Sequence, residues 1–468
     1  MKCISRFLLL IFLLQIVSCQ DEEPDYIPVD TNLKPEIGEE YSGGNATVFN
    51  ESPEAFGFMA KNLTFEEDLA FGVGNSFFRQ SWVSSPASTT ARDGLGPFFN
   101  SNNCSSCHFK DGRGRPPSFD GEIGRGLLLR LSLQGNHSNG NSFSDPVYGN
   151  QLQDNAILGQ TVKGKYKIIY ENLIENFPDG TTVTLKKPNY QINNLGYGAL
   201  ANSILISPRI ANQIIGLGLL EAVDENTILG FAAINTSDGI SGKANYVFDV
   251  ESNSQKLGRF GWKANQPSIR QQVAGAFSGD MGITSSIFPN ENVPFGIDAS
   301  LIPNGGSPEI SNSNFNKVVL YSSSLAVPVR RNFDNQNVLK GKQIFNDIQC
   351  ASCHIPKMQT GNFYSIVALR NQTIRPFTDM LLHDMGDDLA DNAPDFLANG
   401  NEWRTQPLWG IGLIKTVNNH TKLLHDGRAN SVEEAILWHG GEALNAKNKY
   451  KELPVIKRNQ LLEFINSL

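Results

Sequence analysis

The sequence predicts a mainly α-helical protein of two domains, the first of which carries an insertion that contains β-hairpins. Its 468 residues exceed what one hydrophobic core usually supports. Apolar residues recur at helical spacing near both ends of the chain, whereas part of the middle alternates as strands do. We therefore expect a first domain over residues 56–334 and a second over residues 335–468.

The N-terminus has the features of an export signal. A basic start precedes an apolar run over residues 8–14, which is too short to cross a membrane. Small residues then lead to Cys19 in a pattern that resembles a bacterial lipobox. We expect residues 1–19 to be a lipoprotein signal peptide with lipidation at Cys19, and residues 20–55 to be a flexible tether. An ordinary signal peptide cut near Ser18 is the alternative.

Composition and charge limit the classes of molecule that this protein can bind. The formal net charge is −8 at pH 7 and 40% of the residues are hydrophobic, which is ordinary for a globular protein, and no basic stripe could follow a phosphate backbone. We therefore expect no nucleic acid partner. The lipid anchor predicts contact with a membrane of the bacterial cell envelope, at the periplasmic face or the outer-membrane surface.

Four segments carry helix signals. Residues 64–82 and residues 431–438 each begin with a Ser/Thr-x-x-Glu capping box before apolar residues at helical spacing. Residues 338–348 have the same periodicity and run directly into Cys350. Residues 454–468 read as a closing amphipathic helix.

The middle of the chain carries strand signals. Residues 166–170 and residues 181–185 alternate as strands, and the turn sequence Pro-Asp-Gly lies between them at residues 178–180. We expect a β-hairpin there. Gly, Ser and Asn are frequent over residues 135–150 and 303–315, which predicts surface loops.

Cysteine spacing is the most informative feature. The chain has six cysteines, of which Cys3 lies in the expected signal and Cys19 is the expected lipid site. The other four form two Cys-x-x-Cys pairs, and a histidine follows each pair at once: Cys104, Cys107 and His108 in the first motif, and Cys350, Cys353 and His354 in the second motif. None is left over.

This spacing suits covalent haem attachment. Two thiols three residues apart can add to the two vinyl groups of one haem, and the adjacent histidine then binds the iron. The alternatives are disulfides or a four-cysteine zinc site, and neither accounts for His108 and His354. We therefore expect two covalently bound haem c groups, one in each of two c-type cytochrome domains.

Several longer segments resemble one known family. They are Asp93–Asn100, Asp111–Pro117, Gly216–Ala222, Gly258–Ala264, Leu381–Gly386, Trp403–Gly412 and Leu424–Arg428. In this order they resemble the di-haem oxidoreductase family, whose members are called thiol oxidoreductases or peroxidases, from about residue 55 to the C-terminus. The resemblance also implies a distant kinship with bacterial di-haem cytochrome c peroxidases.

The sixth ligand of each iron decides the function, because an open position permits small-molecule chemistry and a filled one favours electron transfer. Met385 stands where a small cytochrome places a thioether ligand, so we expect it opposite His354, with His383 and His425 as rivals. Packing of Met385 in the core is the alternative. His137, in a Gly/Asn/Ser-rich stretch, reads as a surface residue.

Three arginines are expected to bind haem propionates. Arg113 and Arg115 directly follow that motif, and Arg404 precedes Trp409. A guanidinium can hold a carboxylate with two hydrogen bonds. Surface exposure is the alternative, and it weighs more for Arg428.

Glu221 is the expected acid or base, because burial in its apolar surroundings would raise its pKa towards a working value. The alternative is a structural carboxylate paired with an arginine. Trp262, Trp403 and Trp409 are expected either to bridge the haems or to fill the core.

Two functions follow from these expectations. The first is a peroxidase-like oxidoreductase in which one haem is reactive and the other relays electrons. The second is an electron-transfer cytochrome with both irons six-coordinate, linked to iron uptake or respiration. Either would exchange electrons with a redox protein or a small molecule.

Overall fold

The structure, a computed structural model, describes residues 33–119, 121–122, 126–233 and 239–468. The expected signal peptide, its lipid site Cys19 and residues 20–32 of the expected tether therefore lie outside the described residues. Within these ranges, no helix combines the length and the apolar character that a membrane crossing requires.

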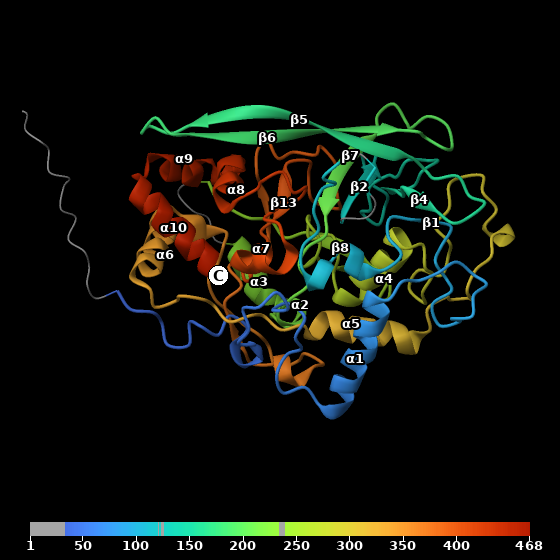
Figure 1. Cartoon of the computed structure of the whole chain (residues 1–468), viewed down its shortest axis with the longest axis horizontal. Coiled ribbons are helices and arrows are strands. Elements are labelled where there is room, and N and C mark those ends of the chain that lie inside the picture. The colour runs from blue at the N-terminus through green and yellow to red at the C-terminus, as the bar shows by residue number, and fades with distance from the viewer. Residues whose placement is uncertain (1–32, 120, 123–125, 234–238) are drawn as a thin grey trace, which may run out of the picture. The chain divides into compact units, whose positions relative to one another are not determined.

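Helices and strands are mixed along the chain (Figure 1). The helices are α1 (Phe65–Arg79), α2 (Leu217–Glu221), α3 (Glu225–Ala232), α4 (Ile269–Asp280), α5 (Asn312–Ser324), α6 (Gln336–Asp347), α7 (Ile414–Asn418), α8 (Val432–Trp438), α9 (Leu444–Glu452) and α10 (Val455–Ser467). The strands are β1 (Phe98–Phe99), β2 (Leu127–Ser132), β3 (Gln151–Leu152), β4 (Asn155–Ala156), β5 (Lys165–Asn176), β6 (Thr182–Asn193), β7 (Leu205–Ile210), β8 (Tyr246–Asp249), β9 (Ser254–Leu257), β10 (Met358–Gln359), β11 (Thr373–Ile374), β12 (Leu382–Asp384) and β13 (Glu402–Arg404).

The prediction of a mainly α-helical fold is wrong. Helices take up 29% and strands 18% of the structure, and the strands form several small sheets. Most of these strands have two to four residues, which is too short for the alternation of apolar and polar residues that marks a strand in sequence. Helical periodicity was therefore visible, whereas most of the strand content was not.

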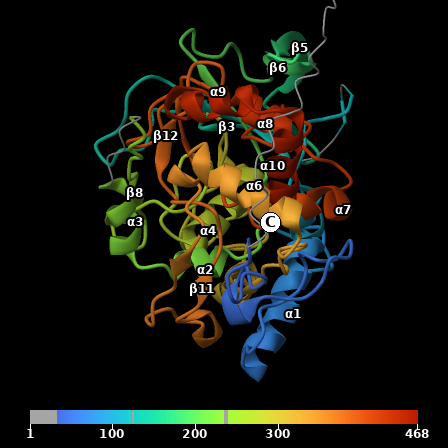
Figure 2. The same cartoon turned by 90° about the vertical axis from the view of Figure 1, so that its left-hand side faces the viewer.

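Each Cys-x-x-Cys-His motif follows a helix that another helix crosses closely. α1 precedes the first motif and packs on α5 (Figure 1), and α6 precedes the second motif and packs on α10 (Figure 2). A Cβ atom at Gly74 would lie 2.1 Å from the Lys317 carbonyl oxygen. One at Gly341 would lie 2.0 Å from the Gln460 carbonyl oxygen. Only glycine allows backbones to approach so closely.

The predicted starts of two helices, α1 and α8, are confirmed by the hydrogen bonds of their N-cap side chains. In α1, the Thr64 hydroxyl accepts from the Glu67 backbone N–H at 3.2 Å, and the Glu67 carboxylate accepts from the Thr64 N–H at 2.8 Å. Ser431 caps α8 by accepting from the Glu434 N–H at 3.1 Å, but the Glu434 carboxylate accepts from the Asn430 N–H at 2.8 Å instead of that of Ser431. These bonds satisfy N–H groups that have no partner within the helix. The helices expected over residues 338–348 and 454–468 are present as α6 and α10.

The predicted hairpin is confirmed and is longer than expected. β5 and β6 pair in antiparallel register along their whole length. The ribbon runs beside α8 and α9 (Figure 1). The Lys451 ammonium on α9 lies 2.6 Å from Glu175, and the Arg458 guanidinium on α10 lies 2.6 Å from Asp179 at the hairpin turn. The ribbon is thus fastened to the helices that follow the second motif.

A three-stranded sheet follows the first motif along the chain. β2 lies between β3 and β7 and pairs antiparallel with both. Leu129 and Leu131 on β2 are buried, while Arg130 between them takes the opposite face, as alternation requires. Arg130 on this second face lines the candidate site.

Residues 36–60 pack on the body instead of forming a tether. Ala46, Ala55 and Phe56 are buried, and Val48 bridges to Pro328. The expected flexible tether to residue 55 therefore ends earlier, before Glu36. Polar composition suggested a linker there, but long-range packing overrides it.

Residues 35–468 form one compact unit by their contacts. The domain boundary expected between residues 334 and 335 falls inside this unit and stays a prediction. The chain on its two sides is in direct contact, because Arg330, just before the boundary, donates to Ser467 at the end of α10 at 3.2 Å.

A buried ion pair fixes the N-terminal segment and gives the first prediction. Arg330 and Glu39 are paired, with side chains 1% and 2% exposed. Glu39→Ala leaves the guanidinium charge buried and unpaired, so we expect it to lower the free energy of unfolding by about 3–5 kcal/mol in urea denaturation. Glu51→Ala, at an exposed carboxylate, is the matched control. An equal loss in both variants would show that the buried pair has no special weight.

Candidate functional site

The first motif is a tight turn held by a side chain that precedes it. Cys104–Ser106 form a turn of 3₁₀-helix, and the Asn103 side-chain oxygen accepts from the Ser106 backbone N–H at 2.8 Å. The His108 N–H bonds to the Cys104 carbonyl at 2.9 Å. All four motif cysteines are free thiols. The described residues contain no group of three or more side chains placed to hold a metal ion, such as a zinc site would use.

His108 is oriented by a backbone carbonyl. Its Nδ1 lies 2.6 Å from the Asn212 carbonyl oxygen, so Nδ1 carries the hydrogen and Nε2 carries the lone pair. Burial lowers the pKa of His108, which keeps the ring neutral. A neutral imidazole with one nitrogen fixed by a carbonyl is the usual form of a metal ligand.

A cavity of about 790 Å³ opens at this motif and is lined by Cys104, Cys107 and His108. Pockets of this size hold organic cofactors. β2 and β7 supply one wall, and α4 with the Trp262 loop supplies another. The cavity therefore joins both thiols and the imidazole in one space, as covalent attachment of a haem requires.

Arg113 and Arg404 line the same cavity and have no acidic partner among the described residues. Nε of Arg113 and one terminal nitrogen of Arg404 are buried without any partner there. Burial lowers the pKa of each guanidinium to about 10. Both residues flank Trp262. The Arg113 guanidinium lies 5.2 Å from the centre of the Trp262 ring, and the backbone N–H of Arg404 donates to the backbone carbonyl of Trp262 at 2.8 Å. Two unpaired buried cations fit the two propionates of a haem.

Arg115 is already paired, contrary to expectation. Its guanidinium makes two hydrogen bonds to the Glu122 carboxylate, at 2.8 and 2.9 Å. The prediction that Arg115 binds a propionate is therefore not supported by this arrangement, because its fork is occupied. Arg428 is likewise paired, with Asp426 at 2.8 Å.

The second motif repeats the turn and the histidine bond. Cys350–Ser352 form the turn directly after α6. Nδ1 of His354 lies 3.0 Å from the Phe377 carbonyl oxygen, and burial lowers the pKa of His354 to about 4. The Phe345 ring packs 6.3 Å from the imidazole, centre to centre. None of the described residues of this motif lines the cavity at the first motif.

His383, a rival ligand of the second iron, is bound by two carboxylates. Its Nε2 lies 2.7 Å from Asp379 and its Nδ1 lies 2.7 Å from Glu442. Although burial disfavours the charge, these hydrogen bonds raise the pKa of His383 to about 12. With each nitrogen facing a carboxylate, this arrangement does not favour His383 as a ligand of iron. Asp379 and Glu442 lie far from each other in the sequence, so the sequence did not predict that both would bind this ring.

The other expected ligands have mixed outcomes. Met385 is half-buried and packs against the same large apolar cluster as Cys350 and Ala351, so its expected place opposite His354 stays a prediction. His425 bonds through Nδ1 to the Pro208 carbonyl at 2.9 Å, and its Nε2 is buried without a partner among the described residues. His137 is exposed, as expected, at the rim of the cavity.

His439 is a histidine that the sequence reasoning missed. Its Nδ1 lies 2.6 Å from the Ala435 carbonyl oxygen one helical turn earlier, which leaves Nε2 available, as in His108 and His354. Its ring is close enough to His354 to disfavour the protonated form of that residue. The sequence feature that could have identified His439 is its position directly after the predicted helix over residues 431–438.

Glu221 is bound by a backbone N–H and a tyrosine hydroxyl, an arrangement that does not support its expected role as acid or base, and that role stays a prediction. Its carboxylate accepts from the Ile269 N–H at 2.7 Å and from the Tyr364 hydroxyl at 2.6 Å. It does not line the cavity, whereas Asp154 and Asp280 do. Burial raises the pKa of both aspartates. Sequence reasoning missed them because neither lies in an apolar run.

Asp280 is linked to a cation across the cavity wall. The Gln151 amide donates to Asp280 at 2.8 Å, and its oxygen accepts from Arg130 at 3.0 Å. Arg130 lines the cavity and makes no ion pair with a described residue. The cavity thus holds a carboxyl that can keep a proton and a cation that can stabilise negative charge.

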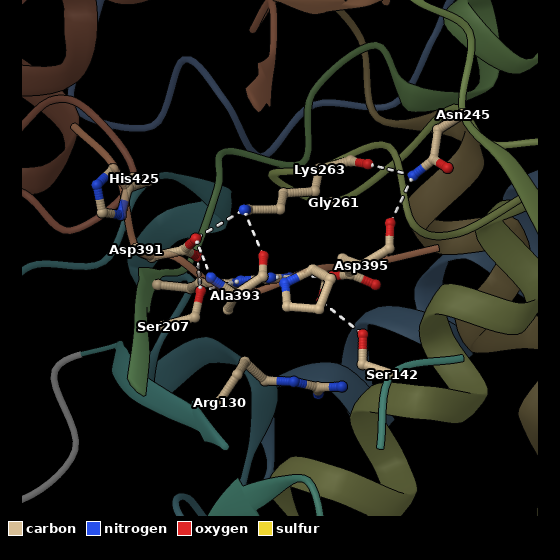
Figure 3. A network of polar contacts seen from close by, with 12 residues as sticks. Arg130, Ser142, Ser207, Asn245, Gly261, Lys263, Asp391, Ala393, Asp395 and His425 are labelled. Carbon is tan, nitrogen blue, oxygen red and sulfur yellow. Dashed lines mark hydrogen bonds and ion pairs between the residues drawn. The ribbon is translucent and has the colours of Figure 1, made fainter. Parts of the chain in front are cut away.

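A buried polar network holds the outer wall of the cavity (Figure 3). The Lys263 ammonium, with a fully buried side chain, lies 2.7 Å from Asp391 and donates to the Ala393 carbonyl at 2.8 Å. The Ser207 hydroxyl also donates to Asp391, at 2.5 Å. Arg209 pairs with Asp395 at 2.9 Å. These bonds fasten residues 391–395 to β7, so the wall is rigid.

Comparisons with known proteins identify the family of this chain. A structure of hydrazine synthase from Kuenenia stuttgartiensis, pressurised with xenon, is similar with a TM-score of 0.30 and 14% identity over 84% of this chain and 92% of that one. No curated protein matches. The model of the family described as "di-haem oxidoreductase, putative peroxidase" matches residues 37–468. The chain therefore belongs to the di-haem oxidoreductase family.

Proposed function

We propose that this protein is a peroxidase-like oxidoreductase with a reactive haem at the first motif and an electron-relay haem at the second. The observation that carries the proposal is the cavity, which joins the first motif to unpaired arginines and a buried carboxyl. Membership of the family supports an oxidoreductase with two haems. The division of roles between the motifs rests on their different surroundings.

The first site offers residues for each part of a haem. Cys104 and Cys107 would attach it covalently, and Nε2 of His108 would bind its iron. Arg113 and Arg404 would hold its propionates. When bound, haem supplies an iron that exchanges single electrons and takes a small ligand where its sixth position is open.

Asp280 is the proposed acid and base of the first site. Burial raises its pKa, so its carboxyl can hold a proton and release it within the cavity. Gln151 positions this carboxyl by its hydrogen bond, and Arg130 beyond Gln151 supplies positive charge. Peroxide reduction needs a group that moves a proton between two oxygens, and the proposal assigns that task to Asp280.

The second site is proposed as the relay. Cys350 and Cys353 would attach the haem there, and His354 would bind its iron. Met385, or His439 in its place, would fill the sixth position and so favour electron transfer. If the first site were also filled, the chain would be an electron-transfer cytochrome, which is the alternative function.

The proposed setting is the bacterial cell envelope. Lipidation at Cys19 would anchor the chain to a membrane, at the periplasmic face or the outer-membrane surface. Export would also bring the four thiols to where c-type haem is attached. A redox protein or a small molecule would then donate electrons to the second haem.

Spectroscopy of the ferric protein tests the proposed function. Protein made with a cytochrome c maturation system is expected to carry two covalent haems by mass and to give one high-spin and one low-spin EPR signal. Hydrogen peroxide is expected to remove the high-spin signal. Two low-spin signals that ignore peroxide would support the electron carrier, and a mass without haem would reject both functions.

Variants of the two carboxyls test the acid and base. Asp280→Asn keeps the size of the side chain but holds no transferable proton, so we expect peroxide turnover to fall by about 10²–10⁴-fold. Glu221→Gln is the control, and we expect it to leave turnover nearly unchanged. The reverse pattern would return the role to Glu221. Steady-state peroxide assays at matched haem content decide between them.

Arginine variants test the propionate sites. Arg113→Gln removes a buried cation from the first haem, which favours the ferric form, so its midpoint potential is expected to fall by on the order of 60 mV, the shift for a tenfold change in a one-electron equilibrium. Arg115→Gln is the control, because that charge is already neutralised by Glu122. Redox titration monitored by absorption measures both. Equal potentials in the two variants would contradict the assignment.

A further inference from the structure

A row of aromatic side chains leads from the cavity at the first motif towards the second motif. It begins with Trp262, which lines the cavity and donates from its indole nitrogen to the Ile210 carbonyl at 2.7 Å. The Trp262 side chain is buried and fixed by this bond. It therefore presents a rigid ring system at the edge of the site where the first haem is proposed.

The next two rings are His425 and Trp403. The His425 ring lies 6.5 Å from that of Trp262, edge to face, and is stacked on Trp403 at 3.9 Å with an interplanar angle of 13°. Nδ1 of His425 bonds to the Pro208 carbonyl at 2.9 Å, and the Trp403 indole donates to the Leu389 carbonyl at 2.9 Å. Both rings are buried, so their contact is fixed and excludes water.

The row continues across two paired strands to the second motif. Trp403 on β13 lies directly opposite His383 on β12. Side chains of directly opposed residues in antiparallel strands share one face, with Cβ atoms about 4.5–5.5 Å apart. Nδ1 of His383 lies 3.5 Å from the sulfur of Cys353, one of the two thiols that would attach the second haem. The row thus ends at the covalent edge of the second site.

We propose that Trp262, His425, Trp403 and His383 form the path by which electrons pass between the two haems. This rests on the proposed two-haem arrangement and adds the route within it. One electron moves at a time: the second haem is oxidised by one electron and the first is reduced by one. No bond forms or breaks, and no proton moves, because the N–H groups along the path stay bound to their acceptors.

Electrons cross this path by tunnelling, without resting on Trp403. The Lys263 ammonium lies 4.5 Å from the centre of the Trp403 ring, and a cation beside an indole stabilises its electron-rich form. Loss of an electron from this ring is therefore disfavoured. Lys263 is itself held by Asp391 (Figure 3). The Trp403 ring, stacked on His425, fills the space along the path with a closely packed π system.

The test measures exchange between the haems without any peroxide. Pulse radiolysis puts one electron into the fully ferric protein, and absorption then follows its redistribution between the two haems. Trp403→Leu is expected to remove the fast phase of redistribution while both midpoint potentials stay as in the parent protein. Trp403→Phe, which keeps an aromatic ring, is expected to retain the fast phase.

Trp409→Leu is the matched control, because Trp409 is equally buried but packs in a different core cluster. It is expected to retain the fast phase. The proposal is overturned if Trp403→Leu keeps the fast phase, if Trp409→Leu loses it as well, or if the parent protein has none. Should Trp403→Leu fail to bind both haems, His425→Leu takes its place with the same expected loss. A chain inactive towards peroxide can still show the fast phase, so this path and the proposed function can fail separately.

Discussion

The hydrogen bond from Nδ1 of each motif histidine to a backbone carbonyl is the interaction on which both candidate haem sites depend. It fixes the hydrogen on Nδ1 and leaves the lone pair on Nε2, where an iron would bind. The carbonyls belong to Asn212 and Phe377, which lie outside the motifs. A Cys-x-x-Cys-His segment can place its thiols by local geometry, but it needs the rest of the fold to orient its imidazole.

The pairing of buried charges separates the parts of this protein that are complete from the part that expects a ligand. Arg330 is paired with Glu39, and Lys263 with Asp391. Arg113 and Arg404 are also buried, but neither makes an ion pair with a described acid. A buried unpaired cation costs several kcal/mol, so a stable fold retains it only where an anion compensates. This is why the two arginines indicate a dianionic cofactor more strongly than the cavity volume does.

Local signals were sufficient for some elements and not for others. The capping box at Thr64 and the long hairpin were predictable because both depend on neighbouring residues. The Cys-x-x-Cys-His motifs and Arg113 could be named as candidate site residues from local sequence for the same reason, and their roles stay predictions. The pairing of Arg115 with Glu122 and the bond from Tyr364 to Glu221 were not, because partner choice is set by tertiary packing. The strand content was underestimated because strands of two to four residues carry no period.

The two motifs are nearly alike in sequence and in turn geometry, so their difference in role has to come from what surrounds them. Around the first, β2, β7 and α4 stand apart and leave a cavity with a carboxyl and free cations. Around the second, α6, α10 and Phe345 pack closely, and His383 is held as a cation by Asp379 and Glu442. The same clamp that disfavours His383 as a ligand holds it still beside Cys353, where a fixed ring can serve electron passage. In the proposed division of roles, the haem beside the cavity reacts and the haem beside the closely packed helices relays, and the proposed path connects the two.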